Sequence, residues 1–206
     1  MSRYTYSASW YDTVSAEPIY RVGREHAIPA LHLQEGSRVL DIGCGTGLDF
    51  PLLLAAVGRS GQVVGVDRSR EMLEVARRKT IQVPPGNVAL VEADAEQLDH
   101  VTAGLDGSGA TFDAVLFTYS LSLMSNWETA WLRAASLVRP GGRAGIVDME
   151  SPHGWARLLG PAARLACLLG GADITARPWT LLERTAPDVQ SWSFRGGHIQ
   201  VRVGTL

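Results

Sequence analysis

Apolar residues fall along this chain in five short runs that alternate with longer amphipathic segments. The runs are rich in valine and other aliphatic residues and are bounded by glycine, proline or aspartate, as buried strands of a parallel sheet are. We therefore predict strands over residues 37–42, 61–67, 87–93, 112–118 and 143–149. The segments between them predict helices over residues 48–58, 69–79 and 126–138. Ser69 suits the N-cap of the second helix, and Pro51 suits the first turn of the first.

Two further runs, residues 189–195 and 198–206, are joined by Gly196 and Gly197 and predict an antiparallel hairpin. Strands that alternate with helices form a mostly parallel sheet, with helices on both faces and ligands at the carboxyl ends of the strands. The predicted fold class is therefore α/β. It is a Rossmann-like, doubly wound, mostly parallel seven-stranded sheet closed by a C-terminal antiparallel hairpin.

The chain has 206 residues, of which 46% are hydrophobic and 19% charged, so we expect one domain over residues 1–206. Within it, we expect residues 37–149 to form a ligand-binding core and residues 150–206 to form further helices, on the side of a substrate, and the hairpin. Residues 1–36 are interpreted as an N-terminal lid and substrate segment, because their first 20 residues are rich in aromatic side chains: Tyr4, Tyr6, Trp10, Tyr11 and Tyr20.

Charge and cysteine usage narrow the classes of partner. The 19 basic residues are balanced by 21 acidic ones, so we expect no nucleic-acid partner. Cys44 and Cys167 have no metal-ligand spacing, which predicts no metal site and a reducing compartment. The N-terminus lacks the apolar region of a signal peptide, and no stretch predicts a transmembrane segment, so we expect a cytoplasmic protein.

One apolar segment, residues 155–169, has only Arg157 and Arg164 as charged residues. Three interpretations stay open at this point. It forms a core helix, the wall of a hydrophobic acceptor pocket, or a peripheral contact with a membrane surface.

Three glycines, Gly43, Gly45 and Gly47, lie between a predicted strand and a predicted helix. A bare backbone there lets the chain turn tightly and lets a ligand touch it. The spacing is G-x-G-x-G, and Leu48 occupies the position of the third glycine of a dinucleotide fingerprint. The lysine of a mononucleotide P-loop is also missing, so the loop is expected to hold another ligand.

Two acids flank this loop. Asp41, directly before it, would repel a pyrophosphate and attract a ligand with a cationic group. Asp67 ends the second strand, 20 residues after Gly47, where a carboxylate of this topology accepts the hydroxyls of a ribose. The residues thus predict a nucleoside that carries positive charge.

Five motifs in order resemble those of the class I S-adenosylmethionine-dependent methyltransferases, in the small-molecule and lipid branch similar to the ubiquinone, menaquinone and phospholipid methyltransferases. They are VLDIGCGTG, VVGVDRSREML, VEADAEQL, FDAVLFTYSL and LVRPGGRAGIVD, and they span about residues 37–149. The resemblance implies S-adenosyl-L-methionine as cofactor, S-adenosyl-L-homocysteine as product, and in-line transfer of a methyl group to a small-molecule or amphiphilic acceptor.

The resemblance also implies roles for residues of this chain. Asp41 and the backbone of Gly43, Cys44, Gly45 and Gly47 would hold the amino-acid end of the cofactor. The ribose would bind Asp67. Around the adenine the resemblance places Arg68, Met72, Asp94 and Ala95, and near the cofactor it places Tyr11.

The acceptor is expected at the loop after the fourth strand, because that loop follows a carboxyl end beside the glycines. Tyr119 is the candidate substrate contact there, and His153 and His26 are candidate bases. A sulfonium methyl is already electrophilic, so proximity is expected to supply most of the catalysis and no nucleophilic residue is required.

Three alternatives stay open. The same cradle could serve aminocarboxypropyl transfer to a lipid, as in the enzymes that build betaine lipids, which GTGLDFPLLL and FRGGHIQVRVGTL also resemble. A dinucleotide-dependent oxidoreductase shares the topology, although Leu48 and Asp41 count against it. A non-catalytic cofactor-binding subunit is the third.

Overall fold

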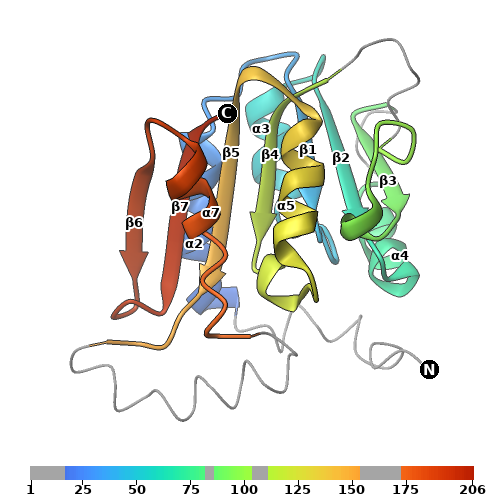
Figure 1. Cartoon of the computed structure of the whole chain (residues 1–206). Helices are drawn as coiled ribbons and strands as arrows, with labels where there is room; N and C mark the ends of the chain where they lie inside the picture. Colours follow the sequence, from blue (N-terminus) through green and yellow to red (C-terminus); the bar gives the residue numbers. More distant parts are fainter. Residues whose placement is uncertain (1–16, 82–85, 104–110, 154–172) are drawn as a thin grey trace.

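The computed structural model describes residues 17–81, 86–103, 111–153 and 173–206 (Figure 1). Its strands are β1 (Arg38–Ile42), β2 (Gln62–Asp67), β3 (Val88–Glu92), β4 (Phe112–Thr118), β5 (Val138–Met149), β6 (Gln190–Phe194) and β7 (Ile199–Thr205). Its helices are α2 (Glu17–Ala30), α3 (Phe50–Val57), α4 (Arg70–Lys79), α5 (Trp127–Ser136) and α7 (Thr180–Thr185), with short 3-10 helices η1 (Ala95–Gln97) and η2 (Leu121–Leu123).

The seven strands form one sheet in the order β3-β2-β1-β4-β5-β7-β6. The pairs among β1 to β5 are parallel, and β7 runs antiparallel between β5 and β6. The predicted seven-stranded, mostly parallel sheet with a terminal antiparallel hairpin is therefore confirmed. The carboxyl ends of β1, β2 and β4 meet at the lower edge of the sheet in Figure 1.

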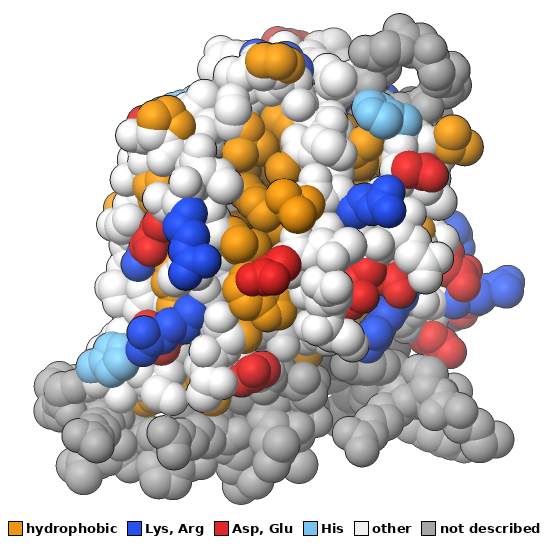
Figure 2. Space-filling model, in the orientation of Figure 1, with side chains coloured by type: hydrophobic (Ala, Val, Ile, Leu, Met, Phe, Trp, Pro, Cys, Tyr) orange, Lys and Arg blue, Asp and Glu red, His pale blue; other side chains and the backbone are white. Residues whose placement is uncertain are grey.

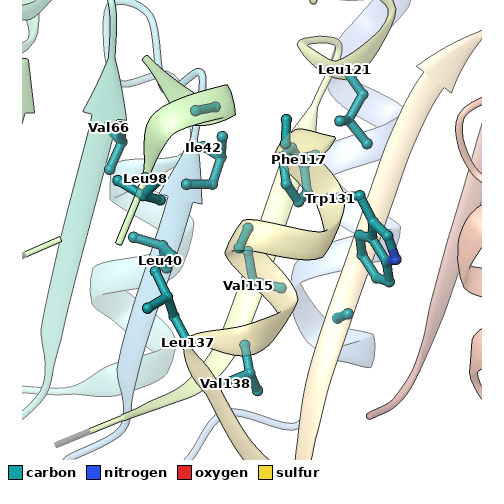
Figure 3. Close-up of a cluster of buried hydrophobic side chains, with 14 of the residues drawn as sticks. Leu40, Ile42, Val66, Leu98, Val115, Phe117, Leu121, Trp131, Leu137 and Val138 are labelled. Atoms are coloured by element: carbon teal, nitrogen blue, oxygen red, sulfur yellow. The ribbon is translucent and has the colours of Figure 1, made fainter. Parts of the chain in front are cut away.

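Side chains alternate between the two faces along each central strand, and each face has its own core. Leu40 and Ile42 of β1 pack with Val115 and Phe117 of β4 under α5, where Trp131 is the largest buried side chain (Figure 3). This cluster fills the face that α5 and α7 cover. Period-two alternation is what a sheet buried on both sides requires.

The opposite face is covered by α2, α3 and α4. Val39 and Leu116 are strand neighbours of residues in the first cluster, and their side chains point to this second face. They belong to a cluster with Leu53 of α3, Leu73 of α4 and Leu31, which directly follows α2. Helices thus lie on both faces, as the sequence predicts. The two cores together bury the central strands and leave only strand ends to form a site.

The predicted helix signals are confirmed in detail. The side chain of Ser69 accepts a hydrogen bond from the Met72 backbone N–H and caps α4. Pro51 lies in the first turn of α3. The Ser69 bond satisfies a backbone N–H that the start of α4 would leave unpaired, and Pro51 has no N–H to satisfy.

Two features differ from the sequence-based expectation. β5 begins at Val138 rather than at residue 143 and passes through Pro140 and Gly141, whose φ is 74°. A register shift in its pairing with β4 accommodates these residues, and Gly141 donates its N–H to the Leu206 carbonyl. The helix α2 is the second feature, because residues 1–36 were interpreted as a lid and substrate segment and no helix was predicted there.

Some predicted features lie outside the described residues: Tyr11 and the rest of residues 1–16, Cys167, and the apolar segment 155–169. Among the helices that are described, none has both the length and the apolar character needed to span a bilayer.

Replacing Trp131 by alanine tests the core under α5. Trp131 is 1% exposed, so the Trp131→Ala variant should lose about 3–5 kcal/mol of unfolding free energy in urea titrations, through lost burial and the cavity left behind. The neighbouring Leu132 is 65% exposed, and Leu132→Ala should change the same quantity by less than about 0.5 kcal/mol. Equal losses in the two variants would contradict the assigned helix orientation.

Candidate functional site

The glycine loop follows β1 and has left-handed backbone at all three of its glycines. The φ angles of Gly43, Gly45 and Gly47 are 69°, 54° and 76°, a region that side chains disfavour. A Cβ at Gly43 would lie 2.4 Å from the Ser120 Cβ, whereas a Cβ at Gly45 would meet nothing within 4 Å. The loop therefore packs tightly at Gly43 and leaves the backbone of Gly45 open to a ligand.

Asp67 connects the glycine loop to α4. Its Oδ2 accepts the Gly45 N–H at 2.8 Å, and its Oδ1 accepts the Ser69 N–H at 2.8 Å. Burial raises the pKa of Asp67, and these two backbone bonds offset part of the rise. Each carboxylate oxygen has a further lone pair, so Asp67 can accept the two hydroxyls of a ribose while it holds the loop.

Asp41 lies at the end of β1 and is fully buried. Neither carboxylate oxygen has a hydrogen-bond partner among the described residues. Burial, and then the nearby carboxylate of Asp49, raise the pKa of Asp41 well above its ordinary value; the Arg24 guanidinium opposes them, and Asp67 adds a further rise. A buried carboxyl of this kind is stabilised by a cationic ligand group.

Arg24 brings a buried positive charge to these acids from α2. Its Nε lies 3.0 Å from Asp49 Oδ1, and both side chains are less than 10% exposed. Its guanidinium also lies over the ring of Tyr119, 5.6 Å from the centroid. No single stretch of sequence contains this cluster, and the sequence pattern did not identify Arg24 or Asp49.

The residues expected near an adenine follow the carboxyl ends of β2 and β3. Arg68 is exposed directly after Asp67, and Met72 is 5% exposed in the first turns of α4. Asp94 is exposed after β3 and accepts the Glu96 N–H at 2.9 Å, so that it caps η1. Ala95 is 7% exposed. The structure thus brings the ends of β2 and β3 together and leaves the adenine contacts as a proposal.

Cys44 is a buried residue of the glycine loop, with its backbone bonded to β2. Its N–H donates to the Val66 carbonyl, and its side chain is 7% exposed. Burial, followed by the charge of Asp41, raises the pKa of the thiol. The thiol therefore stays protonated and contributes packing beside the loop.

The loop after β4 is bound to the ends of β1 and β5. Ser120 donates its hydroxyl to the Ile42 carbonyl at 2.7 Å, directly before Gly43. The N–H and hydroxyl of Ser122 donate to the two oxygens of Asp148 at 3.0 and 2.7 Å. The expected acceptor loop is therefore held against the glycine loop by buried polar contacts.

Tyr119 has a left-handed backbone, with φ of 54°, at the end of β4. Its hydroxyl donates to the Tyr20 carbonyl of α2 at 2.7 Å. Burial raises the pKa of this phenol, so it stays a proton donor. The Tyr119 hydroxyl thus links β4 to α2, and a contact of Tyr119 with a substrate stays a prediction.

The histidines occupy different surroundings. The side chain of His153 is 59% exposed, with Nε2 3.4 Å from Glu150 Oε1. His26 lies with its ring centroid 4.4 Å from that of Phe194, with Nδ1 2.9 Å from the Val22 carbonyl oxygen. The buried one is His198, which the sequence analysis did not single out although it lies within the stretch FRGGHIQVRVGTL.

The donors and acceptors at this edge fit a cationic nucleoside. Asp67 can hold a ribose, Gly45 exposes its backbone, and Asp41 has two buried oxygens without described partners. The buried Oγ1 of Thr118, on the adjacent strand, also has no hydrogen-bond partner within the described part of the chain. Orphaned polar atoms at one strand end indicate a place for a polar ligand.

A family model described as "Methyltransferase domain" matches residues 39–142, half of the chain. The demethylmenaquinone methyltransferase of Staphylococcus epidermidis is 32% identical over 134 residues, which cover 65% of this chain and 52% of that protein. The chain thus spans about half the length of the curated relatives it matches.

Two solved structures show the same fold. A SAM-dependent methyltransferase from Aquifex aeolicus superposes with a TM-score of 0.68 at 17% identity and covers 96% of both chains. An O-methyltransferase family protein from Burkholderia thailandensis has a TM-score of 0.68 at 18% identity, covering 96% of this chain and 57% of that one. At these identities the likeness concerns architecture.

The buried Asp148 gives a pH-dependent test of the acceptor loop. Burial raises its pKa from 3.8 to about 6, although Ser122 and Met149 donate hydrogen bonds to it. The native state then holds this proton more tightly than the unfolded chain, so stability falls as pH rises from about 4 to about 6, by about 3 kcal/mol in all.

The Asp148→Asn variant removes this titration. Urea unfolding at a series of pH values should show the wild type losing about 3 kcal/mol relative to the variant between about pH 4 and pH 7. The variant also loses hydrogen bonds to the carboxylate. This loss shifts its plot of unfolding free energy against pH by a constant amount and does not change the slope. Parallel curves for the two proteins would show that Asp148 does not titrate in this window.

Proposed function

Because the chain belongs to the methyltransferase domain family, we propose that it transfers a methyl group from S-adenosyl-L-methionine to a small-molecule acceptor. The observation that carries the proposal is Asp41, buried beside the open glycine loop with both oxygens lacking described partners. A ligand with an ammonium and a sulfonium group supplies the positive charge that such a carboxylate needs. Asp67, on the next strand, supports the nucleoside part of the same ligand.

In this scheme the chain's own residues bind the cofactor and orient the acceptor. Bound S-adenosyl-L-methionine supplies an electrophilic methyl group, so the protein has to align an acceptor with it and exclude water. Asp41 and the backbone of Gly43 to Gly47 hold the amino-acid end, and Asp67 holds the ribose. Arg68, Met72, Asp94 and Ala95 are proposed to contact the adenine.

The acceptor is proposed to be a small molecule for two reasons. The curated relatives include enzymes named for demethylmenaquinone, which is a small molecule. The formal net charge is −2, and on the face drawn in Figure 2 the basic side chains are interspersed with acidic ones. A phosphate backbone binds best to a continuous basic surface, so a nucleic-acid acceptor is disfavoured.

Replacing Asp67 tests the ribose contact. Asp67→Ala should weaken S-adenosyl-L-homocysteine binding by about tenfold or more in isothermal calorimetry, because hydrogen bonds to a charged acceptor are worth about 1.5–3 kcal/mol. Glu74→Ala, an exposed acid of the following helix that pairs with Arg70, is the matched control and should bind as the wild type does. Unchanged affinity in Asp67→Ala would rule out the proposed pose.

Replacing Asp41 tests the charge contact. In the free protein burial raises the pKa of Asp41, and a cationic ligand favours the ionised form, so affinity for S-adenosyl-L-methionine should rise with pH. The Asp41→Asn variant should bind about tenfold more weakly at neutral pH and should show a flatter pH dependence. A steep pH dependence that persists in the variant would assign the titration to another group.

Product analysis identifies the transferred group. Incubation with S-adenosyl-L-methionine and a panel of phenols, quinols, amines and lipid headgroups should release S-adenosyl-L-homocysteine. Release of methylthioadenosine would instead show aminocarboxypropyl transfer from the same cradle. A parallel calorimetric titration with NADH should give no heat of binding, and binding of NADH alone would support an oxidoreductase.

A further inference from the structure

A buried imidazole lies at the amino end of β7 and faces the first turn of α2. His198 is 8% exposed, with Nδ1 2.7 Å from the Glu150 carbonyl oxygen and Nε2 3.1 Å from the Tyr20 hydroxyl. A carbonyl oxygen only accepts, so Nδ1 carries the hydrogen of the neutral ring. Nε2 is then the acceptor, and Tyr20 donates its hydroxyl proton to it.

The surrounding elements hold this pair in place. Glu150 donates its backbone N–H to the His198 carbonyl at 2.8 Å, which pairs the residues beyond β5 and before β7. The Tyr20 ring packs edge-on against Tyr119, with centroids 5.0 Å apart. Tyr119 in turn donates its hydroxyl to the Tyr20 carbonyl at 2.7 Å. Contacts from four elements therefore orient the phenol and the imidazole.

The pair lies on the side where the acceptor is expected. Tyr119 directly follows β4. Glu150 directly follows β5 and His198 directly precedes β7, so all three residues lie at the same edge of the sheet. Neighbouring strands are about 4.8 Å apart, and β5 lies between β4 and β7. The amino end of β7 therefore lies about 10 Å across the sheet from the carboxyl end of β4. The Tyr20 side chain spans part of this distance, between Tyr119 and His198.

We propose that Tyr20 is a catalytic residue that takes a proton from an acceptor hydroxyl and passes its own proton to His198. The inference rests on the proposed methyl transfer and names its acceptor class: a phenol or enol with an acidic O–H. The acceptor proton moves to Tyr20 Oη as the Tyr20 proton moves to His198 Nε2. The acceptor oxygen forms its bond to the methyl carbon, and the carbon–sulfur electron pair stays on sulfur.

Charged groups around the pair have partners of their own. The Glu150 carboxylate lies 2.5 Å from Arg177 and 3.4 Å from His153, and Arg24 lies over Tyr119. Asp148, the buried acid of β5, is bound by Ser122. When Nε2 of His198 gains the transferred proton, the positive charge on the ring is stabilised by the Glu150 carbonyl oxygen, which accepts a hydrogen bond from Nδ1. His198 acts through Tyr20 and is a positioning and proton-accepting residue.

A coloured phenol tests the proton transfer without turnover. 4-Nitrophenol absorbs visible light as the phenolate, so it is added to the protein in complex with S-adenosyl-L-homocysteine at mildly acidic pH. The wild-type complex should increase the phenolate absorbance above that of the free dye. Tyr20→Phe and His198→Gln should each remove most of the increase, because phenylalanine cannot relay the proton and glutamine cannot accept it.

Conservative variants separate proton transfer from structure. Tyr20→Phe keeps the ring against Tyr119, and His198→Gln keeps an acceptor for the Tyr20 hydroxyl but cannot bind the proton. His32→Gln, at an exposed histidine just after α2, is the matched control and should behave as the wild type. His153→Gln tests the neighbouring histidine and should also retain the phenolate signal. Thermal melts confirm that each variant is folded.

The outcomes distinguish this inference from the proposed function. If S-adenosyl-L-homocysteine binds and no phenolate signal forms, the Tyr20–His198 inference is overturned while the cofactor site stands. A signal that survives in Tyr20→Phe, or is lost in His153→Gln alone, also overturns it. If S-adenosyl-L-homocysteine fails to bind at all in calorimetry, the proposed function fails first.

Discussion

The burial of Asp41 is the constraint on which this molecule depends. A carboxyl at the end of the central strand is removed from water, next to the carboxylates of Asp49 and Asp67. Such a group is tolerated when cations offset its charge. Arg24 supplies one cation from α2, and the proposed ligand supplies the other. Through the Arg24–Asp49 ion pair, α2, which lies outside the matched family region, is held against the start of α3 beside the glycine loop.

The same helix connects the two halves of the site. Arg24 reaches the start of α3, where the glycine loop ends, and Tyr20 reaches the start of β7 four residues earlier along α2. Residues four apart lie on one helix face, so a single face of α2 contacts both regions. Tyr119, directly after β4, contacts both residues. Its ring packs against the Tyr20 ring and lies under the Arg24 guanidinium, and its hydroxyl donates to the Tyr20 carbonyl.

The sheet itself follows from short-range information. The valine-rich runs, the Ser69 cap, Pro51 and the Gly-Gly turn each depend on a few consecutive residues, and each was predicted correctly because backbone preference and side-chain period are local properties. The predicted start of β5, at residue 143, was wrong because Pro140 and the two glycines after it are typical of a turn. Pairing with β4 and with the C-terminal residues outweighs that preference.

By itself the sequence determined the alternating α/β architecture, the glycine loop and the acids Asp41 and Asp67, because spacing along the chain carries that information. Only the tertiary structure decided that Arg24 pairs with Asp49, that Ser122 binds Asp148, and that Tyr20 meets His198, 178 residues away. These pairs form where separate elements pack, and the raised pKa of Asp148 depends on burial that no stretch of sequence contains. The structure thus added a proposed acceptor side to the cofactor side that the sequence predicts.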